Sequence, residues 1–260
     1  MRTLVTFVAA CLLMTVGSMD ANAQRKKKSP GTGPESRTYA ISGTYTRLDV
    51  KSAFDVVVSD TVKAALVTLP AHLHDKVVVE VEHDELTIRL KGQHRLKERP
   101  RVILPHNPRL TKVELSAAST FTTPLGLSGD ALKLDIGGAS RFEGNLTGKK
   151  VDIELSGASW FHGHVEAGMV EYDSKGASSA LMTGSVFMTL DLDMSGASGL
   201  DAKNFTAKKV RGEMSGASNV VVQCTESLRV NLTGVSSLTY IGIPREVNCQ
   251  TDALSKVIKK

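Results

Sequence analysis

Ser156-Gly157-Ala158-Ser159, Ser195-Gly196-Ala197-Ser198 and Ser215-Gly216-Ala217-Ser218 are three copies of one four-residue motif. Relaxed copies begin at Ser116, Gly137, Lys175 and Thr233, so that seven copies start 18 to 21 residues apart. A period near 20 residues is typical of a solenoid, in which each repeat covers the hydrophobic face of the next. The spacing predicts an all-β fold, a parallel β-helix with about 20 residues per coil, over residues 111–258.

The residues around each motif predict a corner between two strands. Apolar side chains recur one and three positions before the motif and five positions after its start, as in Phe121, Phe142 and Phe161. Its second residue is Gly in six of the seven copies, which suits a left-handed bend. Its fourth residue is always Ser. We predict that these serines form a structural ladder whose hydroxyls bond to backbone groups, because no His or Lys recurs beside them as a nucleophile would require.

The N-terminal third of the sequence lacks the repeated motif. Residues 1–23 have a positive start, an apolar run and the small-residue site Ala21-Asn22-Ala23, which predict a cleaved signal peptide and export. Residues 24–36 are rich in Lys, Gly, Pro and Ser and predict a flexible linker. Residues 37–110 predict an irregular β-rich part that precedes the solenoid, with a hairpin turn at His83-Asp84. No later stretch is long and apolar enough to span a membrane.

Composition narrows the class of partner. The net charge is +5 and aromatic residues make up 5% of the chain, with no interleaving of basic and aromatic residues, so a nucleic-acid surface is not expected. Cys224 and Cys249 remain after removal of the signal peptide. An oxidising compartment would permit a disulfide between them; the alternative is two small buried thiols.

Several stretches resemble the head GIN domain family of putative autotransporter adhesins, which are exported bacterial proteins. They are the motif coils, the strand Phe54-Asp55-Val56, the segment Arg101-Val102-Ile103-Leu104-Pro105 and the ending Tyr240-Ile241-Gly242-Ile243-Pro244. The resemblance covers residues 38–257. It implies a β-helical protein of the cell surface or periplasm, with an adhesive role and no known catalytic residues.

An acidic cluster is the first candidate site. Carboxylates occur two residues before most motifs, and in three central coils also four residues before. The cluster comprises Asp152, Glu154, Glu171, Asp173, Asp191 and Asp193. Strand alternation points them to solvent, and Lys150 is the one nearby cation that their spacing predicts. The cluster is either a solvated face that prevents side-to-side pairing or a Ca²⁺ site or docking face for a basic partner.

Trp160, His162 and His164 are the second candidate. They share the outward side of one predicted strand, so that the indole could stack on a sugar ring or join a subunit interface, or be covered by the neighbouring corner. Two His-x-His pairs, His162/His164 and His72/His74, could each supply two metal ligands if they lie on strands, although no third ligand is apparent.

The sequence therefore predicts a non-catalytic binding, adhesion or scaffold protein at the cell surface or in the periplasm. Its partner would be a glycan or protein ligand, and the chain could form a homo-oligomer. No enzyme motif with a nucleophile, phosphate loop or zinc site is found, and no cofactor is expected apart from Ca²⁺. The alternative is a Ca²⁺-dependent, lyase-like enzyme acting on polysaccharides, since such enzymes also use β-helices.

Overall fold

The repeated motifs fold into stacked coils, as their spacing predicts. The computed structural model describes residues 33–260. Its regular secondary structure is nearly all β, and it forms a β-solenoid of about 8 turns with about 19 residues per turn, together with an irregular N-terminal part. The predicted fold class is confirmed. The signal peptide and the linker up to residue 32 lie outside the described residues.

The N-terminal part and the first complete coils contain eight strands and one 3₁₀ helix. They are β1 (Pro34–Tyr39), β2 (Arg47–Val50), β3 (Asp55–Ser59), β4 (Ala65–Pro70), η1 (Ala71–Lys76), β5 (Val77–Glu82), β6 (Glu85–Leu90), β7 (Arg101–Pro105) and β8 (Lys112–Leu115). The later coils are built from β9 (Thr120–Ile136), β10 (Arg141–Leu155), β11 (Trp160–Ser174), β12 (Ser179–Met194), β13 (Gly199–Met214), β14 (Asn219–Leu232), β15 (Ser237–Ile241), β16 (Glu246–Thr251) and β17 (Lys256–Lys259). In these coils, the strands from β9 to β14 are longer and bend around the core, and the shorter β15, β16 and β17 end the stack.

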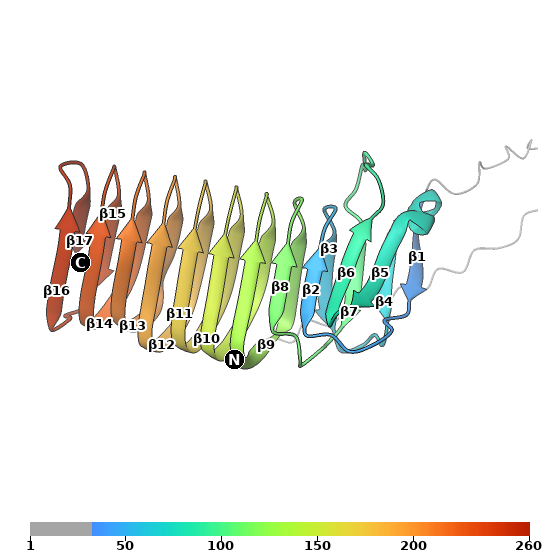
Figure 1. The fold of residues 1–260 in the computed structure, drawn as a ribbon, viewed down its shortest axis with the longest axis horizontal. Helices are drawn as coiled ribbons and strands as arrows, with labels where there is room; N and C mark the ends of the chain where they lie inside the picture. Colours follow the sequence, from blue (N-terminus) through green and yellow to red (C-terminus); the bar gives the residue numbers. More distant parts are fainter. Residues whose placement is uncertain (1–32) are drawn as a thin grey trace, which may run out of the picture. The chain divides into compact units, whose positions relative to one another are not determined.

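Parallel pairing places equivalent residues of neighbouring coils side by side (Figure 1). Phe142 of β10 lies between Phe121 and Phe161, with ring centroids 5.8 and 5.5 Å apart. All three side chains are fully buried. Burial of one such side chain contributes about 1.5–3 kcal/mol, so the predicted apolar columns are the main source of solenoid stability.

The motifs form tight corners that lock to one another. The N–H of Ala158 donates to the carbonyl of Gly138 at 2.7 Å, and the same bond joins each later motif corner to the one before it. A Cβ on Gly157 would lie 2.4 Å from that carbonyl oxygen, and φ at Gly157 is 73°. Both the left-handed backbone and the close approach of the preceding coil therefore require glycine.

The serine ladder has the structural role predicted for it. The fourth-position serines are buried, and most of their hydroxyls donate to the carbonyl of the first residue of the same corner. The bond from Ser198 to Ser195, for example, is 2.7 Å long. Each of these bonds satisfies a carbonyl at the bend, and the Ser140 hydroxyl instead accepts from the N–H of Ser119.

Two coils of the stack come from outside the predicted solenoid, one formed by β2 and β3 and the other by β6 and β7. Strand β2 pairs in parallel with both β6 and β8, and β3 pairs in parallel with both β7 and β9. The predicted boundary at residue 110 therefore does not mark where the stack begins, because residues 47–59 are one of its coils. Their corner, Lys51-Ser52-Ala53-Phe54, lacks the Gly and final Ser of the motif.

Antiparallel strands close the N-terminal end. The predicted hairpin is present as β5 and β6, with His83 and Asp84 at φ values of 48° and 66°. Strand β4 pairs with β7, and β1 pairs with β4. Residues 34–36 therefore belong to β1, which corrects the end of the predicted linker. This edge strand is almost entirely exposed, so its residues are polar and small like those of a linker. Composition alone therefore suggested a linker there.

Candidate functional site

Strand β11 presents Trp160, His162 and His164 on its outer side. They alternate with Phe161, Gly163 and Val165, which face the core. The alternation follows from the two-residue period of a strand, so the three candidate side chains share one face as predicted. The structure leaves Trp160 partly exposed rather than covering it with the neighbouring corner.

Two neighbours hold the indole of Trp160. Arg141 is paired with Trp160 across β10 and β11, and its guanidinium carbon lies 4.5 Å from the centre of the indole. The ring of His162 lies 5.3 Å from the indole, tilted by 60°. On the other side the register partner is the small residue Ser179, followed by Gly199 one coil further. The indole is therefore fixed on one side and free of bulky neighbours on the other.

A polar groove of about 340 Å³ opens beside this platform. His162 and His164 contribute to its wall. The other lining residues are Thr122, Thr123, Pro124, Glu143, Gly144, Asn145, Gly163 and Thr183. The groove thus combines a carboxylate, an amide, hydroxyls and imidazoles, which are directional hydrogen-bonding groups.

His164 is oriented by two contacts on the groove wall. Its Nδ1 atom lies 3.2 Å from Oγ1 of Thr183, and its Nε2 atom lies 3.2 Å from a carboxylate oxygen of Glu166. The Glu166 carboxylate also accepts a hydrogen bond from Ser185 at 2.6 Å. These contacts fix the ring without burying it.

Sequence reasoning missed Glu143, Asn145 and Thr183 in this groove, and Arg141 beside Trp160. Each lies in a coil next to β11, at or beside the register position of a predicted site residue. An alignment of the outward-facing residues of adjacent coils would have found them. Residues at the same distance after their corners lie side by side on neighbouring strands.

The acidic cluster has more cations than the sequence predicted. Lys133 forms ion pairs with Asp152 and Glu154, and its Nζ lies 3.3 Å from the Asp152 carboxylate. Arg211 binds Asp191 through two hydrogen bonds of 2.7 and 2.5 Å. The prediction that Lys150 is the one nearby cation is therefore wrong. Lys133 and Arg211 are the direct register partners of Asp152 and Asp191 in the flanking coils, so each cation lies beside one end of the cluster.

Lys150 itself pairs with Glu171 at 2.7 Å, which leaves Asp173 beside Asp193. Within residues 33–260, neither of these two carboxylates forms an ion pair. Partial burial raises the pKa of Asp173, and the charge of Asp193 raises it further. In the part of the chain that the structure describes, no group of three or more His, Cys, Asp or Glu side chains is placed to hold a metal ion. Calcium binding by the cluster stays a prediction.

The other His-x-His pair does not lie on a strand. His72 and His74 belong to the 3₁₀ helix η1, where residues two apart do not share a face. His74 is buried, with Nδ1 at 2.9 Å from the hydroxyl of Tyr39 and Nε2 at 2.9 Å from the carbonyl of Glu35. Both ring nitrogens are engaged in anchoring β1, which corrects the predicted geometry.

The two cysteines are both free thiols. Cys224 is buried in β14 and Cys249 is partly exposed in β16. Burial raises the pKa of each thiol. Of the two alternatives left open by the sequence, the structure has the unbonded form.

Comparisons with known proteins extend these observations. The sequence matches the family described as "Putative auto-transporter adhesin, head GIN domain" over residues 44–244. A comparison with curated proteins gives no match. Within residues 33–260, no helix has the length and apolar character needed to cross a bilayer.

Solved structures share the architecture. A crystal structure described as a putative lipid binding protein from Parabacteroides distasonis has a TM-score of 0.76 at 19% identity, covering 88% of this chain and 97% of its own. A putative adhesin from the same organism has a TM-score of 0.75 at 22% identity, with 88% and 98% covered. A putative adhesin from Parabacteroides merdae has a TM-score of 0.69 at 16% identity, with 88% and 96% covered. At these identities the likeness concerns the fold alone.

Proposed function

Because this chain belongs to the family of putative auto-transporter adhesin head GIN domains, we propose that it is an exported, non-catalytic protein that binds a carbohydrate at its Trp160 face. The binding role agrees with the names of the similar structures, which are adhesins and a lipid binding protein. The carbohydrate is inferred from the residues of this chain.

The observation that carries the proposal is the platform of Trp160 beside the polar groove. One side of the indole is held by Arg141 at 4.5 Å, and Ser179 and Gly199 leave room next to it. Aromatic rings with one apolar face and nearby polar groups suit the alternating C–H and O–H surface of a pyranose. The carboxylate of Glu143 and the amide of Asn145 supply hydrogen-bonding partners for hydroxyls in the adjoining groove.

The polar lining favours a sugar over an acyl chain as the occupant of this groove. Four of its ten residues carry a carboxylate, an amide or an imidazole, and three more carry hydroxyls. Within residues 33–260, His164, Thr183 and Thr123 already have hydrogen-bond partners in the protein. An acyl chain would leave the Glu143 carboxylate and the Asn145 amide without partners, at a cost of about 1–3 kcal/mol for each group that loses water.

The lyase-like alternative requires cations that act on a substrate. In the acidic face, Lys133 and Arg211 already neutralise carboxylates of the protein. That arrangement supports a solvated surface rather than a catalytic groove. Export to the periplasm or cell surface is supported by the signal sequence predicted for residues 1–23.

A glycan array probed with the mature protein tests the proposal, followed by titration of each hit. Trp160 is the single tryptophan of the chain, so its fluorescence reports directly on ligand at this face. We expect hits that change the Trp160 emission, and we expect Trp160→Ala to abolish their binding. Asn219→Ala is the matched control, because Asn219 occupies the same position after its corner three coils away.

Three outcomes would contradict the proposal. They are the absence of any glycan hit, retention of full affinity by Trp160→Ala, and equal loss of affinity in Asn219→Ala. A parallel absorbance assay for unsaturated sugar products on each hit distinguishes the lyase-like alternative, since product formation would show a catalytic protein.

A further inference from the structure

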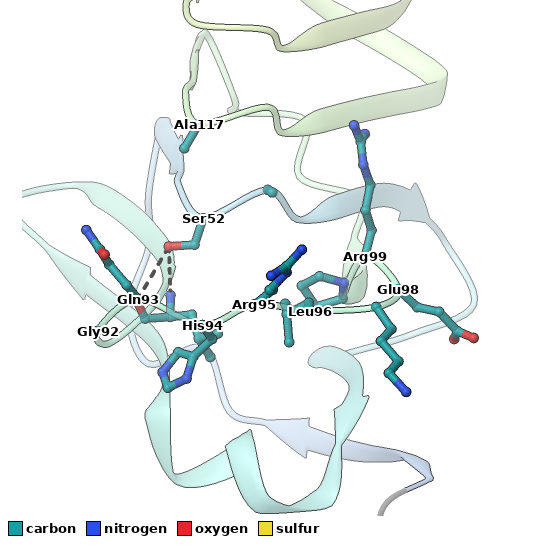
Figure 2. A pocket seen from close by; sticks show the side chains of 13 residues that line it. Ser52, Gly92, Gln93, His94, Arg95, Leu96, Glu98, Arg99 and Ala117 are labelled. Atoms are coloured by element: carbon teal, nitrogen blue, oxygen red, sulfur yellow. Dashed lines mark hydrogen bonds between the residues drawn. The ribbon is translucent and has the colours of Figure 1, made fainter.

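A loop rich in basic residues replaces the tight corner in the first coil. Strands β6 and β7 are joined by residues 91–100, whereas the next coil uses the four-residue corner that contains Ser52 and Ala53. A cavity of about 560 Å³ lies between the loop and the corners of the following coils. Figure 2 shows Ser52 and Ala117 on one side of this cavity and the loop residues His94, Arg95 and Leu96 on the other.

The cations of this cavity are unpaired. Arg95, Lys97 and Arg99 line it together with a single carboxylate, Glu98. Within residues 33–260 none of these four side chains forms an ion pair, although the cations of the acidic face do. Glu98 points away from Arg95 in Figure 2. Uncompensated positive charge in a concave site raises the local concentration of anions.

The loop is anchored at both ends, so the cavity is formed before any ligand enters. The hydroxyl of Ser52 accepts a hydrogen bond from the N–H of Leu90 at 3.2 Å. At the other end, the carbonyl of Pro100 accepts from the N–H of Asp55 at 2.9 Å. Arg99 donates to the hydroxyl of Thr120 at 3.1 Å. Anchoring reduces the entropy lost on binding.

The corner under the loop is strained in a way that later corners avoid. Ser52 and Ala53 have φ values of 71° and 58°, and Ala117 and Ala118 have 54° and 66°. A left-handed backbone is unfavourable for any residue with a Cβ, and such strain concentrates at functional sites. From Gly157 onward the corners require Gly because the preceding coil also lies too close for a Cβ. At Ser52 the preceding coil has the wide loop between β6 and β7 in place of a tight corner. This loop leaves space for side chains and for a ligand.

Apolar surface accompanies the charge. Leu90 is buried at the base of the loop, Leu96 packs against the core, and Pro100 is buried behind it. A free inorganic ion would make no use of this wall. A molecule with an organic body and a terminal anionic group would use both parts of the cavity.

From this cavity we infer a second binding site, which accepts the carboxylate or phosphate group of an organic anion, with Arg95 as its principal contact. An Arg guanidinium matches either oxyanion through two parallel N–H···O bonds. The inference does not depend on the proposed carbohydrate site at Trp160, since the two sites share no lining residue.

Isothermal titration of the mature protein with three probes tests the inference. The probes are glucose 6-phosphate, glucuronate and glucose, which share a sugar body and differ in the anionic group. We expect saturable binding of at least one anion and weaker or no binding of glucose. The anion that binds more tightly distinguishes phosphate from carboxylate as the natural group, and added salt should weaken it.

Two arginine variants test whether the anion binds in this cavity. Arg95→Ala should weaken anion binding by about tenfold or more, the usual loss for a hydrogen-bonded charge. Arg109→Ala is the matched control, because Arg109 is exposed, forms no ion pair within residues 33–260 and lies outside the cavity. It removes the same charge and should change affinity less than about twofold. Thermal melting of both variants confirms folding.

The inference is overturned if no anion binds saturably, if glucose binds as tightly as its charged analogues, or if the two Arg variants lose affinity equally. Trp160→Ala provides the remaining check. It should leave anion binding intact. Loss of anion binding in Trp160→Ala would place the anion in the groove beside the indole instead. Failure of the carbohydrate proposal would leave the anion result unchanged, so the two can be judged separately.

Discussion

The guanidinium carbon of Arg141 lies 4.5 Å from the centre of the Trp160 ring, one strand away in the stack. An arginine over an indole at this distance stabilises the ring orientation by about 0.5–1 kcal/mol at an exposed site. Arg141 therefore acts as the support of the aromatic platform.

Removal of that support should be visible in the fluorescence of the single tryptophan. We expect Arg141→Ala to shift the Trp160 emission to longer wavelength and to weaken glycan binding by about two- to fivefold, the equivalent of the lost cation–π contact. Arg141→Lys should restore part of the original emission wavelength and part of the glycan affinity. An unchanged spectrum in Arg141→Ala would show that the contact does not hold the indole in solution.

Two glycines with the same backbone conformation should respond differently to alanine. Gly138 and Gly157 have φ values of 74° and 73°. A Cβ on Gly138 would meet Ala117 at 3.4 Å, but on Gly157 it would lie 2.4 Å from the carbonyl oxygen of Gly138. Gly138→Ala should cost about 1–2 kcal/mol from the left-handed backbone alone. Gly157→Ala should cost about 1–3 kcal/mol more from overlap, as measured by thermal or denaturant unfolding. Equal losses would contradict the role assigned to coil stacking.

Tyr172 should tolerate loss of its hydroxyl. Burial raises its pKa to about 12. The nearby Ser174 hydroxyl opposes this shift slightly, but within residues 33–260 neither hydroxyl makes a hydrogen bond of good geometry. We expect Tyr172→Phe to increase the free energy of unfolding by about 1 kcal/mol, because it removes a buried polar group that is unsatisfied. Tyr39→Phe is the control of opposite sign, since the Tyr39 hydroxyl contacts Nδ1 of His74 at 2.9 Å and donates to the His74 carbonyl at 3.0 Å.

Stability should depend on pH through Asp173. Its pKa is raised by partial burial and by neighbouring carboxylates, so the folded protein holds that proton more tightly than the unfolded chain. The charge therefore destabilises the fold above the raised pKa, and the penalty disappears as pH falls below the unfolded value. We expect Asp173→Asn to stabilise the protein at pH 7 by less than about 1 kcal/mol, or about 2–4 °C in Tm, after screening.

The gain from Asp173→Asn should shrink as the pH of the melt is lowered. Asp201→Asn is a suitable control, because Asp201 is paired with Lys203 at 3.1 Å and its loss should bring no stabilisation. A gain that grew at low pH would contradict the assigned direction of the shift.

Calcium should have little effect on thermal stability. Three cations already pair with four of the six clustered carboxylates, and Ca²⁺ needs six or more oxygen ligands. We expect the same Tm in millimolar Ca²⁺ and in chelator. A rise of several degrees would instead support the calcium site that the sequence left open.

The regular coils could be predicted from sequence because every position after a corner recurs with the same environment. Phe121, Phe142 and Phe161 could be recognised as one buried column from spacing alone, and the serine ladder from its invariance. The outward side of Trp160 followed from strand alternation.

Other parts could not be predicted because they depend on contacts between residues far apart in the sequence. Leu48 lies beside Leu86 and Val113, 38 and 65 residues away, and its coil lacks the motif that marked the rest. The basic residues of the loop 91–100 can be read in the sequence, but the cavity beside them depends on the corner at Ser52, which lies about 40 residues earlier.

The position of the coil formed by β2 and β3 also governs how the protein can be shortened. Deletion from the C-terminal side would remove one complete layer at a time and leave each remaining layer in contact with its neighbours. Deletion of the N-terminal residues up to 59 would instead remove a coil from the interior of the stack. Strands β6 and β7 would then lose the coil that connects them with β8 and β9. During synthesis from the N-terminus, β2 and β3 likewise cannot complete their pairing until residue 121 has emerged. The strands that pair with them on both sides are all later in the sequence.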